Sequence, residues 1–213
     1  MTVLAGVIAC ALVGWFAAGT IYNVRRGSAV MRWMQAEPHG GLRLLGGRAS
    51  VRWLGSTVVE LTVRDAEAPF TSAAVVVFLE PRDLPWWPLS RLRGRRDTLI
   101  LRGELRRAPA IEFEALDPQS WSGRDALPRV PQQWPQRVAA VAAGLDVRPA
   151  NDAALERAET MLAAAGRTGL AVRRLSVRST APNFQLHLGL PDDRQSAHDF
   201  FQSVRSLAEA AIG

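Results

Sequence analysis

Two adjacent tryptophans between prolines, followed by four arginines, form the segment best suited to recognition chemistry. The segment reads PWWPLSRLRGRR and covers residues 85–96. Indole rings favour the interface between a bilayer and water, and guanidinium groups form strong hydrogen bonds with phosphate. We therefore predict a membrane-interface loop that contacts anionic lipid headgroups. Its predicted contact residues are Trp86, Trp87, Arg91, Arg93, Arg95 and Arg96.

Two other interpretations of this segment remain open. The tryptophans could fold back onto the domain and leave the arginines solvated. Arginines beside aromatic rings also bind nucleic acid, but no recognisable nucleic-acid fold accompanies the segment. We therefore do not expect a nucleic-acid partner.

Polar residues near the C-terminus could perform acid–base chemistry. His187, Asp192, Asp193 and His198 could converge on one end of a hairpin and suit a hydrolase or a metal site. Their spacing matches no known ligand pattern, and helix capping and surface exposure explain these residues better. A membrane-tethered hydrolase is therefore only the alternative function.

Glu112 and Glu114 alternate on one predicted strand, as the paired carboxylates of glycosidases sometimes do. Charge pairing with arginines is the better explanation for them. We therefore predict no catalytic, cofactor-binding or metal-binding residues and no cofactor.

The composition excludes several classes of chemistry. The 26 basic residues are all arginine, so the chain has no lysine for a Schiff base or a P-loop. The single cysteine is Cys10, inside an apolar run, which leaves the rest of the chain without a thiol nucleophile or cysteine metal ligands. No motif identifies a known family.

The apolar run Val3 to Tyr22 predicts a membrane-spanning helix. It contains no charged residue, and twenty residues at about 1.5 Å each match the roughly 30 Å hydrocarbon core of a bilayer. A cleaved signal peptide needs a basic segment before the run, and only Met1 and Thr2 stand there. A lipoprotein signal using Cys10 is a loose match, so we predict an uncleaved anchor.

Small residues recur at four-residue spacing along this helix. They would lie on one face and let a second helix approach closely. We predict that this face pairs with a partner protein or a second copy of the chain. The predicted helix-packing residues are Gly6, Cys10, Gly14 and Ala18.

The charges give an orientation. Arg25, Arg26 and Arg32 follow the apolar run, and positive flanks stay in the cytoplasm. We therefore expect the N-terminus outside the cell membrane and the remaining chain inside. Residues 23–107 carry 15 arginines and 8 acidic residues, whereas residues 108–213 carry 11 and 12. The half next to the membrane is thus the basic half and suits anionic lipid.

The elements after the anchor predict an α+β fold. Alternating apolar residues around Val51 and Leu61 indicate a hairpin, and the run at residues 73–79 indicates a buried strand. Strands at residues 98–106 and from Ile111 should pair with each other, and they complete a mostly antiparallel sheet of five or six strands. A C-terminal unit should follow as helix, strand, strand and helix.

These elements divide into four predicted parts. A transmembrane anchor with its juxtamembrane helix covers 1–36, an antiparallel β domain covers 40–116, a linker rich in Pro and Trp covers 117–134, and an α/β unit covers 135–213. A short helix is expected from Pro135 to Gly144. We expect the chain to act as an accessory subunit, assembly factor or scaffold at the inner membrane face.

Overall fold

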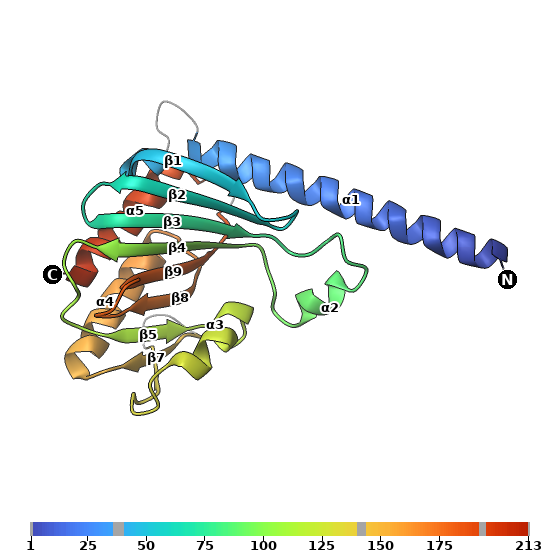
Figure 1. Cartoon of the computed structure of the whole chain (residues 1–213). Helices are drawn as coiled ribbons and strands as arrows, with labels where there is room; N and C mark the ends of the chain where they lie inside the picture. Colours follow the sequence, from blue (N-terminus) through green and yellow to red (C-terminus); the bar gives the residue numbers. More distant parts are fainter. Residues whose placement is uncertain (1, 36–40, 140–143, 192–194, 213) are drawn as a thin grey trace.

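Nine strands form one antiparallel sheet in the part of the chain that the structure describes (Figure 1). The computed structural model describes residues 2–35, 41–139, 144–191 and 195–212. The strand order is β1-β2-β3-β4-β9-β8-β5-β7-β6, and each neighbouring pair is antiparallel. The strands are β1 (Gly46–Trp53), β2 (Val58–Ala66), β3 (Phe70–Phe78), β4 (Thr98–Leu105), β5 (Phe113–Leu116), β6 (Arg137–Val138), β7 (Asp146–Pro149), β8 (Val172–Val177) and β9 (Phe184–Gly189).

One face of the sheet packs against helices and forms the main core. Helices α4 (Asp152–Arg167) and α5 (Ala197–Ile212) lie against this face, which presents alternate strand residues such as Leu61, Leu101 and Leu186. Asn151 caps α4 by accepting a hydrogen bond from the Ala154 amide at 2.9 Å, as expected of an N-cap. The apolar stripe of α5, including Phe200 and Val204, is buried in this core.

Helix α1 (Thr2–Gln35) is continuous and has two different halves. Every residue from 2 to 18 is exposed, and we call this segment the free half. In residues 19–35, the docked half, one face is buried against the domain. Near its end Trp33 packs edge-on against Phe200, with ring centroids 5.3 Å apart, and its indole donates a hydrogen bond to the Gln195 carbonyl. The 3₁₀ turn η1 (Gly41–Leu44) then leads into β1.

The other face of the sheet is largely polar, and a short helical segment covers one end of it. Helix α3 (Trp121–Ala126) and the 3₁₀ turn η2 (Leu127–Arg129) lie here, within the predicted linker. Leu116, Ala126, Val130 and Trp134 form a small second apolar cluster beneath them.

The α+β class and the antiparallel sheet are confirmed, but the predicted count of five or six strands is wrong. Strands β6 and β7 have two and four residues, too short for an alternating pattern to reveal. In addition, β6 at Arg137–Val138 lies where a helix was expected.

The predicted pairing of β4 with β5 is also wrong. Strands β9 and β8 lie between them, so strands from residues 40–116 and 135–213 alternate in one sheet. Strand β9 pairs with β4 because its leucines, although distant in the sequence, continue the buried apolar face of β4.

Candidate membrane-facing site

The free half of α1 offers an apolar surface that the domain does not cover. Val3 and Val13 are 80% and 68% exposed, and the helix is long and apolar enough to cross a membrane. A signal sequence near an N-terminus passes the same test of length and composition. No neighbouring atom lies within 4 Å of where a Cβ would stand on Gly6 or Gly14. Cys10 and Ala18 are likewise exposed, so all four predicted helix-packing residues lie outside the contact with the domain.

The docked half begins where α1 meets the segment that joins β3 to β4. We call residues 79–97 the β3–β4 connection. A Cβ on Gly19 would overlap the main chain of Arg82 and Asp83, so only glycine permits this close approach. Asn23 is fully buried two residues before the charged pair Arg25 and Arg26. The connection is therefore packed directly against the last turn of the predicted membrane span.

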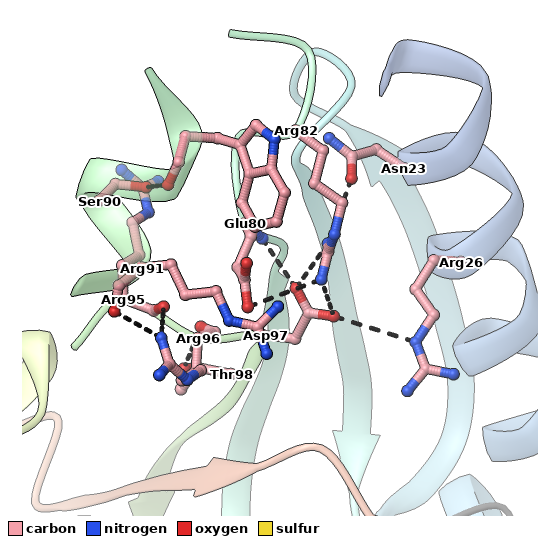
Figure 2. Close-up of polar contacts among 11 residues, drawn as sticks. Asn23, Arg26, Glu80, Arg82, Ser90, Arg91, Arg95, Arg96, Asp97 and Thr98 are labelled. Atoms are coloured by element: carbon pink, nitrogen blue, oxygen red, sulfur yellow. Dashed lines mark hydrogen bonds and ion pairs between the residues drawn. The ribbon is translucent and has the colours of Figure 1, made fainter. Parts of the chain in front are cut away.

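A polar network holds this contact together (Figure 2). The guanidinium of Arg82 donates two hydrogen bonds to the Asp97 carboxylate, at 2.9 and 3.1 Å. It also donates to the Asn23 side chain at 3.4 Å, and Arg26 on α1 lies 3.9 Å from Asp97. Asp97 further accepts the Glu80 amide at 2.8 Å. The two ends of the connection are thus tied to each other and to α1.

Two aromatic residues of α1, one in each half of the helix, contact Arg82 of the connection. The indole of Trp15 donates a hydrogen bond to the Arg82 carbonyl at 3.1 Å, and the Arg82 guanidinium stacks 5.0 Å over the ring of Tyr22. Tryptophan and tyrosine concentrate at membrane interfaces because one end of each side chain is polar. If the free half of α1 spans a bilayer, the connection lies beside the domain-side end of the span, close to the headgroups.

Within the connection, α2 (Trp87–Leu92) points its apolar residues into solvent. Trp86 and Leu89 are each 58% exposed and Leu92 is 84% exposed. Pro88 fits the first turn of this short helix. Figure 1 shows α2 projecting on the side of the domain from which the free half of α1 emerges. Helix α2 and the free half of α1 therefore project from the same side of the domain.

The six predicted membrane-interface residues lie on α2 or directly beside its two ends, and their surroundings differ. Trp87 lies under the Arg91 guanidinium, 5.9 Å from its ring centre, and Arg95 stacks 5.5 Å from the ring of Trp121 on α3. Arg96 donates to the carbonyls of Arg91 and Arg95. Sequence reasoning missed Leu89 and Leu92, although their spacing of three from Trp86 indicates one helical face.

The C-terminal polar residues are not brought together among the described residues. His187 lies on the polar face of β9, between Leu186 and Leu188 of the main core, whereas His198 lies on α5, which covers the opposite face. Asp192 and Asp193 lie outside the described residues. Burial, then the charges of Arg174 and Arg102, lower the pKa of His187 to about 3. Neither ring nitrogen of His187 has a hydrogen-bond partner, and no group of three metal-binding side chains occurs in the described ranges.

Glu112 and Glu114 have structural partners. Glu114 is fully buried and accepts hydrogen bonds from Arg174 at 3.0 Å, Ser176 at 2.6 Å and Arg178 at 2.9 Å. Glu112 accepts the hydroxyl and the amide of Ser179, and these hydrogen bonds lower its pKa. Both carboxylates therefore serve to join β5 to the β8–β9 hairpin.

Comparison with known proteins gives no assignment. No protein-family model matches the chain, and no curated protein matches its sequence.

Proposed function

We propose that the chain is a single-pass membrane protein whose domain sits on the inner face of the cell membrane. The free half of α1 is the anchor, and the N-terminus lies outside. Two features support this: α1 continues without a break from the apolar run into the core, and Arg25, Arg26 and Arg32 follow the run on the domain side. Met34 at the far end of the same helix is fully buried.

The observation that carries the proposal is the position of α2. Helix α2 lies on the side of the domain from which the anchor emerges (Figure 1), and Leu89, Leu92 and the preceding Trp86 are exposed. Exposed apolar groups of this kind mark an interaction surface, and arginines beside them suit anionic headgroups. The connection is the second membrane contact, and it holds the domain in a fixed orientation against the bilayer.

The domain then acts by binding, as an accessory subunit, assembly factor or scaffold. The small residues Gly6, Cys10, Gly14 and Ala18 supply the face through which the anchor meets a partner helix or a second copy. This face is free of contacts with the domain, and membrane helices pair through such faces.

The binding role is tested by purifying the full-length chain in mild detergent and identifying stoichiometric partners by mass spectrometry. A Gly14→Ile variant should lose the partner or the self-association, because the added side chain blocks close helix approach. Val13→Leu, at an exposed apolar neighbour, is the matched control and should retain it. A chain that is solitary and monomeric by cross-linking in native membranes would overturn this role.

The orientation is tested separately with a single new cysteine. In a Cys10→Ser background, Thr62→Cys places a thiol on the exposed face of β2. An impermeant maleimide should label it only after the inner face of the membrane is opened. Labelling in intact cells would reverse the proposed topology.

A further inference from the structure

A basic hollow of about 940 Å³ lies between α2 and α3. The described residues that line it include four arginines, Arg91, Arg93, Arg96 and Arg124, and no acidic residue. Three of them come from the β3–β4 connection, but Arg124 comes from α3, about thirty positions later in the chain. The fold therefore assembles this charge from two segments that the sequence separates.

Main-chain contacts join the two segments. Gly94 ends α2 with a φ of +76°, and a Cβ at this position would overlap the carbonyl oxygen of Gln119. Glycine adopts this conformation without strain and allows the close approach. Arg124 donates hydrogen bonds to the carbonyls of Arg93 and Gln119, which ties α3 to the end of α2. These contacts between α2 and α3 therefore fix the shape of the hollow.

None of the four arginines forms an ion pair with an acidic residue in the described part of the chain. Two of the guanidinium groups are held by main-chain carbonyls: Arg96 donates to Arg91 at 2.6 Å, and Arg124 donates to Gln119 at 2.7 Å. A carbonyl orients a guanidinium but leaves its full charge available. Four such charges around one hollow favour an anion, and arginine suits phosphate oxygens in particular.

We infer that this hollow binds the phosphodiester headgroup of one anionic phospholipid. The inference rests on the proposed contact between the β3–β4 connection and the membrane. A lipid is favoured over a soluble phosphate because Leu92 both lines the hollow and is 84% exposed. A headgroup in the hollow would therefore leave its acyl chains beside the apolar face of α2. A bound lipid would make the contact between the domain and the membrane selective for anionic membranes.

The test uses the full-length chain, stripped of lipid in detergent, and native mass spectrometry. Phosphatidylglycerol and phosphatidylcholine with the same acyl chains are titrated separately, and inorganic phosphate is titrated without lipid. The wild type should bind one phosphatidylglycerol in preference to phosphatidylcholine. The double variant Arg91→Gln/Arg93→Gln should lower phosphatidylglycerol affinity about 25-fold, since each arginine near a lipid charge contributes roughly fivefold.

A charge-matched control separates the hollow from general electrostatics. Arg107→Gln/Arg129→Gln removes the same charge from two exposed arginines outside the hollow and should keep the preference. Equal binding of the two lipids, or equal loss in both double variants, would overturn the inference. Tight binding of inorganic phosphate with no lipid preference would instead identify a soluble phosphorylated ligand and overturn the lipid source.

The proposed seating can fail independently of this site. If a spin label on α2 reports an aqueous position in anionic bilayers, the proposed contact between the domain and the membrane is wrong. If that label reports the interface while the two lipids bind equally, only the headgroup site is wrong.

Discussion

Two groups of arginines in this chain share one side-chain chemistry and have opposite surroundings. Arg174 and Arg178 both bind the fully buried Glu114 carboxylate, and Arg178 also stacks 4.4 Å from the ring of Trp134. Arg91 and Arg93, at the hollow between α2 and α3, have no acidic partner among the described residues. The Glu114 carboxylate neutralises the first group inside the fold. The second group keeps its positive charge at the surface, where an anion can bind.

The difference separates stability from recognition. A buried arginine without its acid leaves an uncompensated charge, so the Glu114 group should matter to folding. An exposed arginine without an acid costs little, so the second group should matter to binding alone. The Arg82–Asp97 pair is an intermediate case, because it is neutralised but joins the docked half of α1 to the connection (Figure 2).

The largest effect is expected from Glu114→Gln. The variant leaves Arg174 and Arg178 without a carboxylate in a buried setting, which should lower the free energy of unfolding by about 3–5 kcal/mol. Urea unfolding in mild detergent, followed by tryptophan fluorescence, measures it. Glu104→Gln, an exposed glutamate on β4, is the control and should change stability by less than about 0.5 kcal/mol. Similar losses in both variants would contradict the comparison.

His187 sharpens the comparison, because it is a buried base close to the positive charges of Arg174 and Arg102. Its pKa is about 3 in the folded protein and 6.5 in the reference state. Between these values the unfolded chain takes up a proton that the folded chain does not, so stability should fall as the pH falls below 6.5. The slope should reach about 1.4 kcal/mol for each pH unit.

The measurement for His187 is urea unfolding from pH 7 to pH 4.5. His187→Leu cannot take up this proton, so its stability should decline less steeply over the same range. Parallel curves for the two proteins would show that His187 titrates normally in the folded state.

A smaller effect should separate the two halves of α1. Gly19→Ala forces a Cβ into the Arg82 carbonyl, which should cost about 1–3 kcal/mol and loosen the connection. Gly14→Ala, five residues earlier, has open space and should not lower stability. Hydrogen exchange of residues 79–97 should rise in the first variant only. A rise in neither would show that the connection does not depend on this contact.

The smallest effect on stability is expected from the arginines at the hollow. Arg91→Gln/Arg93→Gln should change the free energy of unfolding by no more than about 0.5 kcal/mol, because neither side chain has an acidic partner among the described residues. Urea unfolding under the same conditions as for Glu114→Gln gives a direct contrast. A loss comparable to that of Glu114→Gln would remove the distinction between the two groups.

Local patterns in the sequence predicted the elements that a single segment determines. The long apolar helix and the β1–β2 hairpin both follow from the spacing of apolar residues within a few positions. They could be predicted because hydrophobic periodicity is a local property.

The remaining features depend on contacts between distant segments. Glu114 meets Arg174 and Arg178, which lie 60 and 64 positions away, and nothing local indicates which arginine a glutamate will bind. Similarly, Arg124 joins the hollow only because Gly94 allows α2 and α3 to approach. The predicted interface residues include three of the four arginines at the hollow, whereas the hollow itself and Arg124 required the fold.

Helix α1 contributes to the core of the domain. Deleting residues 1–36 to obtain a soluble domain would remove Asn23 and Met34, which are fully buried, and break the core. The full-length chain in a defined bilayer is the suitable sample.

The most direct test of the central claim is the depth of α2 in such a bilayer. In a Cys10→Ser background, Leu92→Cys carries a spin label in nanodiscs of phosphatidylcholine and phosphatidylglycerol, and Thr62→Cys is the control on the exposed sheet face. Collision rates with oxygen and with a water-soluble nickel chelate report the depth of each label. We predict that the label at position 92 lies at the membrane interface, protected from nickel, while the label at position 62 is aqueous. Equal nickel access at both positions would contradict the seating of the domain on the membrane.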